Sequence, residues 1–395
     1  MMIKLIFFLI LLFRCHLINN SENDLKVFNL GSSKKIEKLR LSDLDMKNIH
    51  YIPLETNEKS VISSGDNLYF HDYTINKIIS AGNSIFFKNH AKIIKFKRTG
   101  EFETVIAPIG RGPEEVTQIN DFDIDFNTNN IYILSGWQKK IKIYNENGAY
   151  LREINLPFYS HELDVYENKI ILSCGNNSGK NEYSYIILDL NGNVLRYFRN
   201  NHKFTNKSGY GFAHENLFYQ TGDKLCRKGI YSDTIYYLNK NSYIPYLVLE
   251  AGNRLITPEV MTSKDMIYIC NNYIQPMSLF EFGNFIYYQY MYKYNPPSEA
   301  IFYGFIGSKT DNYSVVFDAE SGIINDLDGG PDFQPLFVNG ENELVSLKDP
   351  LSLKSYIKSA SFKNSVPKYP EKKKEFEKLV NSLKETDNPV LILVK

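Results

Sequence analysis

The sequence lacks a surplus of either charge and lacks the paired cysteines that hold many metal and redox centres. Its 45 Lys and Arg residues balance its 45 Asp and Glu residues, so the formal net charge is zero. Without net charge there is no whole-molecule attraction to nucleic acid, and we expect no nucleic-acid partner. The four cysteines include no CxxC pair, which excludes a zinc ribbon and a thioredoxin-like redox motif.

Common catalytic and metal-binding motifs are missing as well. The seven histidines are scattered and form no HExxH motif, and no G-x-S-x-G elbow marks a serine nucleophile. The glycine-rich segment at 110–115 (GRGPEE) lacks the Lys and Ser/Thr of a phosphate-binding loop, so a tight turn is expected there. The sequence therefore assigns no catalytic residue and no metal ligand, and it favours a protein that is not an enzyme.

Three cysteines lie singly in the body of the chain, at Cys174, Cys226 and Cys270. Their spacing does not resemble a disulfide scaffold, which a chain of 395 residues does not need. We expect buried, apolar thiols, with a disulfide between two of them as the alternative if the chain is exported.

An apolar leader is the first feature that is present. The unbroken apolar run at 5–13 (LIFFLILLF) is too short to span a bilayer but typical of a signal-peptide core. Cys15 follows closely, with Leu12 three residues before it, as at the processing site of a lipoprotein. The large residues at 13–14 (FR) fit that site poorly, and ordinary signal-peptide removal is the alternative. We expect a signal peptide at 1–15 and export to the periplasm or to the outer-membrane or cell surface, with membrane attachment only through an acyl chain on Cys15.

Aromatic residues make up 14% of the chain, with 29 Tyr and 26 Phe. Aromatic and β-branched side chains favour strands. From about residue 36 the sequence consists of short runs of such residues, separated by the turn formers Asn, Gly, Asp and Ser. We therefore expect a polar linker at 16–35 and one all-β domain at 36–395.

A repeat of strand, turn, strand, glycine-containing turn and strand occurs three times in the first half of this domain. The turn glycines, Gly100, Gly148 and Gly192, lie 48 and 44 residues apart. Asn147 and Gly148 both suit the positive φ of a two-residue hairpin turn. A period in the forties is typical of a β-propeller blade, because one small sheet cannot bury both of its faces alone. The length allows six blades, with seven as the alternative.

The last part of the sequence departs from the strand pattern. Residues 370–384 have the period of a helix with one apolar stripe. The stripe consists of Phe376, Leu379, Val380 and Leu383. An Asn-Pro pair ends the helix, and Val390–Val394 is an apolar strand. Because a propeller ring must close, we expect this strand to pair with strands from 36–41 and 51–54.

Several segments together resemble the exported bacterial six-bladed β-propeller proteins, which are related in fold to the NHL-repeat propellers. The matching segments occur in the same order, at 51–55 (YIPLE), 109–115 (IGRGPEE), 121–125 (DFDID), 232–236 (SDTIY) and 387–393 (DNPVLIL). Glu114 replaces the third glycine of the usual Gly-x-Gly-Pro-Gly-Glu turn. The resemblance implies a six-bladed propeller, often carried behind a lipoprotein signal, with no established activity.

Candidate ligand-binding residues are sought in the loops, because a rigid propeller presents its loops at the mouths of the central channel. Arg111 could point into a channel mouth and meet an anionic ligand there. His202 and His214 could converge on one loop face, and Tyr210 lies between them in the sequence. We take these four residues as the candidate binding site.

Three acidic residues, Asp121, Asp123 and Asp125, alternate with apolar ones, so a strand would present three carboxylates on one face. The spacing of an EF-hand is absent, and we expect solvated or turn-bonded carboxylates. A structural calcium ion is the alternative, and no other cofactor is expected.

Four tyrosines at 288, 290, 292 and 294 would share one face of a strand. Packing between blades is the expected role, and stacking on a sugar is the alternative.

The sequence as a whole favours a cell-envelope binding or interaction protein whose ligand is an unknown protein or carbohydrate. The alternative is a propeller enzyme, a lyase or hydrolase acting on a carbohydrate or lactone-like substrate at the channel mouth. A third hypothesis is a structural partner in a surface complex, which would expose an apolar patch on a blade edge.

Overall fold

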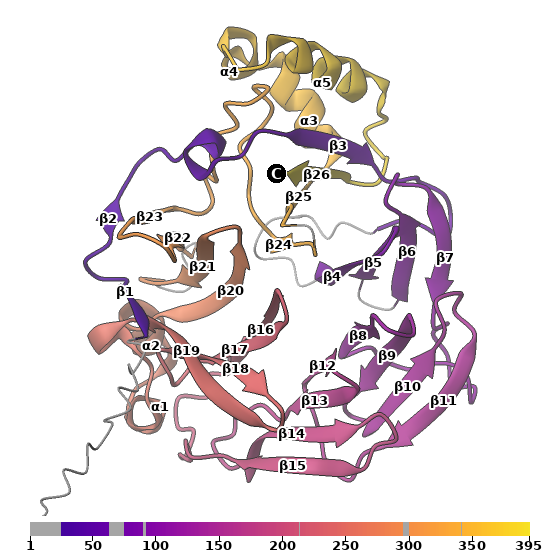
Figure 1. Ribbon diagram of the computed structural model, residues 1–395, viewed down its shortest axis with the longest axis vertical. Helices are drawn as coiled ribbons and strands as arrows, with labels where there is room; N and C mark the ends of the chain where they lie inside the picture. Colours follow the sequence, from indigo (N-terminus) through magenta and orange to yellow (C-terminus); the bar gives the residue numbers. More distant parts are fainter. Residues whose placement is uncertain (1–24, 63–74, 90–91, 213, 295–299, 341) are drawn as a thin grey trace, which may run out of the picture.

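The computed structural model describes residues 25–62, 75–89, 92–212, 214–294, 300–340 and 342–395. Within these ranges six small sheets form a ring around a central channel (Figure 1). The domain is a six-bladed β-propeller, as predicted, and the seven-bladed alternative is excluded. The expected signal peptide and Cys15 lie outside the described residues. None of the helices in the described ranges is long and apolar enough to cross a membrane.

Blades one to three are antiparallel sheets of four consecutive strands, ordered from the channel outward. Blade one contains β4 (Ile75–Ala81), β5 (Ser84–Asn89), β6 (Lys92–Lys97) and β7 (Phe102–Ile106). Blade two contains β8 (Asp121–Asp125), β9 (Asn130–Ser135), β10 (Lys140–Tyr144) and β11 (Tyr150–Asn155). Blade three contains β12 (Glu162–Tyr166), β13 (Lys169–Ser173), β14 (Tyr183–Asp189) and β15 (Val194–Arg199).

Blades four and five each carry a fifth strand on the outer edge. Blade four contains β16 (Asn216–Thr221), β17 (Lys224–Gly229), β18 (Thr234–Asn239), β19 (Ser242–Glu250) and β1 (Lys26–Asn29). Blade five contains β20 (Gln275–Phe282), β21 (Phe285–Met291), β22 (Phe302–Ser308), β23 (Ser314–Asp318) and β2 (Lys34–Lys35). The sequence places a linker at 16–35, whereas the described part of that range adds β1 and β2 in parallel to β19 and β23. β2 is a pair of exposed lysines that needs only backbone pairing, so it gives no strand signal. β1 (KVFN) is only four residues long, although its Phe28 is buried in the core.

Blade six joins the two ends of the described chain. From the channel outward it contains β24 (Phe337–Val338), β25 (Leu344–Lys348), β26 (Val390–Val394) and β3 (Ile49–Pro53). β26 runs antiparallel to β3, with Val390 opposite Pro53 and Val394 opposite Ile49. The predicted closing strand is therefore confirmed, with 51–54 as its partner region. Residues 36–41 do not pair with it; Arg40 instead bridges to Ile324, after β23.

In the described ranges, the α-helices occur in two insertions. The first, between blades four and five, contains a 3-10 turn, η2 (Gly252–Arg254), and helices α1 (Pro258–Ser263) and α2 (Met266–Asn272). The second, between β25 and β26, contains α3 (Pro350–Lys358), α4 (Ala360–Asn364) and α5 (Pro370–Ser382) and projects from the ring beside blade six (Figure 1). A further 3-10 turn, η1 (Leu41–Leu44), precedes β3. α5 is the predicted helix, and its stripe residues Phe376 and Val380 are buried against α3 and α4. α3 and α4 are too short for a helical period to show in the sequence.

The repeated turn glycines have positive φ, 93° at Gly100, 83° at Gly148 and 93° at Gly192. Each donates its N–H to the carbonyl oxygen three residues earlier, as from Gly148 to Asn145 at 3.0 Å. The glycine therefore closes a four-residue turn, and the expected two-residue turn with positive φ at Asn147 is wrong. At Gly100 a Cβ would lie 2.2 Å from the carbonyl oxygen of Pro53, so the contact of blade one with blade six also requires glycine.

Packing between blades uses the aromatic residues. Tyr288 and Tyr290 are 1% and 2% exposed and belong to one buried cluster with Leu217 and Tyr219 of blade four. The packing role is thus confirmed for these two, whereas Tyr292 and Tyr294 lie beyond the end of β21. Cys174, Cys226 and Cys270 are buried free thiols, which confirms the first of the two expectations for them.

Candidate functional site

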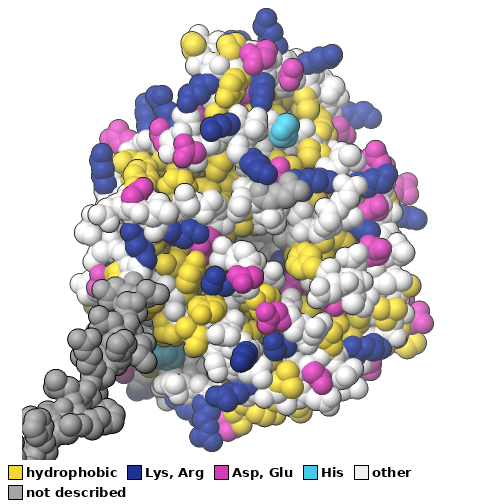
Figure 2. All heavy atoms as spheres, in the orientation of Figure 1, with side chains coloured by type: hydrophobic (Ala, Val, Ile, Leu, Met, Phe, Trp, Pro, Cys, Tyr) yellow, Lys and Arg dark blue, Asp and Glu magenta, His cyan; other side chains and the backbone are white. Residues whose placement is uncertain are grey.

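Two cavities in the described part of the propeller bring polar side chains together. The first lies between blades three and four, has a volume of about 340 Å³, and is called the inter-blade pocket below. The second lies in the central channel, between the first strands of the blades, and has a volume of about 700 Å³. We call it the channel cavity, and the middle of the face in Figure 2 is hollowed at this place, with side chains of both charges around it.

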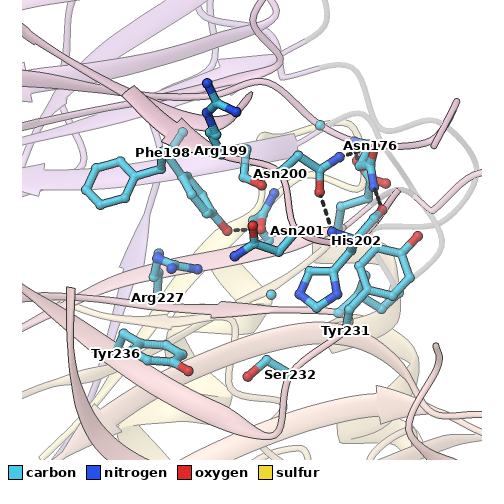
Figure 3. A pocket seen from close by; sticks show the side chains of 17 residues that line it. Asn176, Phe198, Arg199, Asn200, Asn201, His202, Arg227, Tyr231, Ser232 and Tyr236 are labelled. Carbon is cyan, nitrogen blue, oxygen red and sulfur yellow. Dashed lines mark hydrogen bonds between the residues drawn. The ribbon is translucent and has the colours of Figure 1, made fainter. Parts of the chain in front are cut away.

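The inter-blade pocket is built from β14 and β15 of blade three, from β16 to β18 of blade four, and from the segments that follow β13, β15 and β17. Its lining residues are Gly175, Asn176, Ser184, Tyr185, Phe198, Arg199, Asn200, Asn201, His202, Glu215, Asn216, Arg227, Gly229, Ile230, Tyr231, Ser232 and Tyr236. Figure 3 shows Arg227 and Tyr236 on one side of the pocket and His202 and Tyr231 on the other.

Asparagine side chains hold the loop at 200–202 in place. Asn200 Nδ2 donates to Asn176 Oδ1 at 2.8 Å, and Asn176 Nδ2 donates to the backbone oxygen of His202 at 2.7 Å (Figure 3). The backbone N–H of His202 donates to Asn200 Oδ1 at 2.9 Å. These bonds join the end of β13 to the segment after β15, and they orient the imidazole of His202 toward the pocket.

Arg227 is held against aromatic rings. It lies directly opposite Tyr236 in the pairing of β17 with β18, which places the two side chains on the same face. Its guanidinium carbon lies 4.1 Å from the ring centroid of Tyr185, 4.0 Å from that of Tyr243 and 5.1 Å from that of Tyr236. Cation–π contacts of this kind hold the guanidinium in place. The buried Nε of Arg227 has no hydrogen-bond partner among the described residues.

Glu215 and Tyr231 also present buried atoms to the pocket. Glu215 accepts a hydrogen bond from the backbone N–H of Asn176 through Oε2, while its Oε1 has no partner in the described ranges. The hydroxyl of Tyr231 likewise has no partner there. Burial raises the pKa of Glu215 to about 7, an effect that the Asn176 hydrogen bond opposes. A substantial fraction of Glu215 is therefore protonated at neutral pH.

His202 lines the pocket beside Tyr231. Its ring stacks on Tyr231, with the centroids 5.3 Å apart and the planes at 30°. Burial, together with the positive charge of Arg227, lowers the pKa of His202. The imidazole is thus neutral at pH 7 and offers one donor and one acceptor.

The channel cavity has an acidic and an apolar wall. On the acidic wall, Lys77 Nζ lies 3.3 Å from Asp121 Oδ1 and 4.0 Å from Asp164 Oδ1. Burial raises the pKa of Asp123 to about 6 and that of Asp164 to about 7, although the charge of Lys77 lowers both. The apolar wall comes mainly from blades four to six and includes Leu217, Phe218, Tyr219, Met277, Leu279, Phe280, Leu336 and Phe337.

The three aspartates of β8 have structural partners. Asp121 Oδ2 and Asp123 Oδ2 accept hydrogen bonds from the backbone N–H groups of Leu163 (2.8 Å) and Val165 (2.6 Å) in blade three. Both carboxylates are buried, so the expectation of solvated groups is wrong here: they satisfy donors on the free edge of β12. Asp125 is turn-bonded as expected, since it accepts from the backbone N–H of residue 127 and the hydroxyl of residue 128.

No three His, Cys, Asp or Glu side chains are arranged for metal binding within the residues that the structure describes. The calcium ion that the sequence allows at these aspartates has no further support and stays a prediction.

The four candidate residues from the sequence do not form one site. His202 lines the inter-blade pocket, whereas His214 lines the channel cavity. Tyr210 donates its hydroxyl hydrogen to Gln275 Oε1 at 2.6 Å and packs on Phe212, beside the pocket. Arg111 is exposed in the tight turn between β7 and β8 and lines neither of the two cavities.

Sequence analysis missed Glu215, Arg227 and Tyr231. Arg227 lies in the strand KLCRKG, where an alternating charge normally faces solvent. Glu215 and Tyr231 lie just before β16 and just after β17, and no local pattern marks them. One signal was present: three asparagines, at 176, 200 and 201, occur at the ends of apolar strands, where side-chain hydrogen bonds to the backbone order loops.

Comparison with known proteins gives the family and the fold. No curated protein is significantly similar to the chain. A protein of Bacteroides fragilis, described provisionally as exported, is 17% identical with a TM-score of 0.71, over 93% of this chain and 98% of that one. A member of the DUF4221 family from Bacteroides vulgatus is 12% identical with a TM-score of 0.50, over 69% of this chain and 86% of that one.

These identities support the shared propeller fold and nothing finer. The relation to NHL-repeat propellers stays a prediction. The family described as a domain of unknown function, DUF4934, matches residues 25–395. Because this match covers most of the sequence, the chain belongs to the DUF4934 family.

Proposed function

We propose that this protein is an exported binding protein of the cell envelope and that its inter-blade pocket takes a saccharide. The observation that carries the proposal is the convergence of Arg227 Nε, Glu215 Oε1 and Tyr231 Oη, which are buried and have no partner among the described residues. Each unpaired atom of this kind costs about 1–3 kcal/mol. A ligand that hydrogen-bonds to all three recovers this free energy.

The size and lining of the pocket favour a small polar ligand over a protein surface. About 340 Å³ lies at the lower end of the range of small-molecule sites, roughly 300–1,000 Å³. Hydroxyl groups both donate and accept hydrogen bonds, as Glu215 and His202 require of a ligand. The rings of Tyr231 and Tyr236 supply apolar faces for the carbon skeleton.

Export rests on the leader at 1–15, and attachment to the membrane rests on Cys15. Neutral net charge fits a protein that does not bind nucleic acid or anionic lipid as a whole. A carbohydrate is thus the partner that this proposal selects from the two that the sequence leaves open.

Isothermal titration calorimetry of the purified protein with neutral and acidic mono- and disaccharides tests the binding function. At least one sugar is expected to bind at one site per chain, and Tyr231→Phe and Glu215→Gln are expected to weaken it. Glu182→Gln, at an exposed position that does not line the pocket, is the matched control and leaves affinity unchanged. Absence of any sugar binding, or equal affinity in all four proteins, contradicts the proposal.

Location is tested by cell fractionation with metabolic labelling by a fatty acid. The protein is expected in the envelope fraction, with the label lost in Cys15→Ser. A cytoplasmic wild type contradicts export. An unlabelled wild type in the envelope contradicts acylation but supports ordinary signal-peptide removal.

A second candidate function, an enzyme of the lyase or hydrolase type, is favoured by the channel cavity. Asp123 and Asp164, with pKa values of about 6 and 7, can exchange protons near neutral pH beside Lys77. Incubation with oligosaccharides and mass analysis of the products tests it. Cleavage that is lost in Asp164→Asn supports the enzyme, and intact substrate after long incubation contradicts it.

A further inference from the structure

We infer that the ligand of the inter-blade pocket carries a carboxylate, so that it is an acidic sugar such as a uronic acid, and that Arg227 binds this carboxylate. The inference rests on the proposed saccharide-binding function and specifies the ligand class.

The charge of Arg227 has no counter-ion in the part of the chain that the structure describes. No carboxylate oxygen of a described residue lies within ion-pair distance of its guanidinium. Arg227 is half-buried, and a partly desolvated charge is normally paired because desolvation without a partner is costly. Glu215, which also lines the pocket, is a weak counter-charge at neutral pH, since burial raises its pKa to about 7. The pocket is therefore short of one negative charge.

The setting of Arg227 favours a planar anion. The rings of Tyr185 and Tyr243, whose centroids are 5.6 Å apart, hold the guanidinium from two directions. Nε of Arg227 has no hydrogen-bond partner among the described residues, and Nε together with a terminal nitrogen forms the edge that makes paired hydrogen bonds with a carboxylate. A guanidinium that is already fixed loses little entropy when such an anion binds.

The other polar side chains that line the pocket can form hydrogen bonds with the hydroxyl groups of a ligand. Glu215 Oε1 and Tyr231 Oη can each accept a hydrogen bond from a ligand hydroxyl, and the neutral His202 ring can donate or accept one. The carboxylate and the hydroxyls of an acidic sugar are spaced over a rigid ring, so one ligand can meet both Arg227 and Glu215.

An amino acid, the other small ligand with a carboxylate, fits less well. Its ammonium group has three donors and needs several acceptors. The side-chain oxygens of Asn176, Asn200 and Asn216 already accept hydrogen bonds within the protein, from Asn200, His202 and Tyr185. Glu215 is the only carboxylate among the lining residues that would face the ammonium group, and at neutral pH a substantial fraction of it is protonated.

The test compares galacturonic acid with galactose, with the methyl ester of galacturonic acid, with galactose 6-sulfate and with glutamate, by calorimetry on the full protein. Galacturonic acid is expected to bind about 10- to 100-fold more tightly than galactose and than its own methyl ester, as one charge-assisted pair predicts. Arg227→Gln is expected to remove this difference and to keep the weak affinity for galactose. Arg227→Lys keeps the positive charge but cannot form paired hydrogen bonds with a carboxylate, so it is expected to retain part of the preference for the acidic sugar.

Arg196→Gln is the matched control, since Arg196 also lies over an aromatic ring, that of Phe198, but does not line the pocket. It is expected to leave all affinities unchanged, and circular dichroism confirms that each variant is folded. Equal binding of acidic and neutral sugars overturns the inference and leaves the saccharide function standing. Tighter binding of the sulfate or of glutamate also overturns it, and absence of all sugar binding overturns both proposals.

Discussion

Replacing Glu215 with Gln is expected to stabilise the protein at alkaline pH and to change its stability little near pH 4. Burial raises the pKa of Glu215 to about 7 from an ordinary value of 4.5. Between these values the folded protein binds more protons than the unfolded chain, so its stability falls as pH rises and the loss is complete above the folded pKa. The difference in pKa corresponds to about 3 kcal/mol.

Gln keeps the acceptor for the backbone N–H of Asn176, and its extra N–H has the same cost at every pH. The informative quantity is therefore the difference in unfolding free energy between Glu215→Gln and wild type, measured by urea denaturation at several values between pH 4 and pH 8. This difference is expected to grow by about 3 kcal/mol in favour of the variant. The exposed control Glu182→Gln is expected to show no growth. A constant difference across this range refutes the argument that burial destabilises the Glu215 carboxylate.

Three further predictions concern the ring itself, and each is measured by chemical denaturation. Lys309→Met is expected to lower the free energy of unfolding by about 3–5 kcal/mol, because Lys309 Nζ lies 2.6 Å from the buried Glu281 carboxylate. Adding Glu281→Gln should restore most of this stability, and a double variant no more stable than Lys309→Met would contradict the argument. Leu391→Ala in the closing strand is expected to cost about 2–5 kcal/mol, since Leu391 is fully buried, and a cost near zero would mean that blade six contributes little. Gly100→Ala should destabilise the protein by more than about 1 kcal/mol. The control is Gly222→Ala, since Gly222 also has positive φ but an added Cβ there would meet no atom within 4 Å. Equal losses of stability in the two variants would refute the close contact with Pro53.

Much of the ring was predictable because its signals are local. Strand alternation and a glycine in each repeated turn depend on neighbouring residues, so the blade period could be read from Gly100, Gly148 and Gly192. β2 gave no signal, because an added edge strand uses backbone hydrogen bonds that any sequence can form. β1 was too short to be recognised, although it places Phe28 in the core. The pairing of Val390–Val394 with 51–54 followed from the need to close a ring, a global constraint that the residue pattern alone does not contain.

The site was far less predictable than the ring. Arg227, Glu215 and Tyr231 meet His202 only because blade three packs on blade four, and no spacing in the sequence encodes this contact. The loop at 200–215 shows the difficulty directly, because it sends His202 into the inter-blade pocket and His214 into the channel cavity. Two histidines in one loop looked like one site, and the direction of each side chain was decided by the turns between them.

The pairing of β3 with β26 also sets the order in which the molecule can be assembled. Pro53 and Val390 are 337 residues apart in the sequence, and a ribosome completes the first of them long before the second. Until β26 is made, β3 has no partner in its sheet, and β25 presents an open edge that another chain could pair with. The nascent protein is therefore an open arc with unpaired edges, and it becomes a closed, protected ring only once β26 has been made.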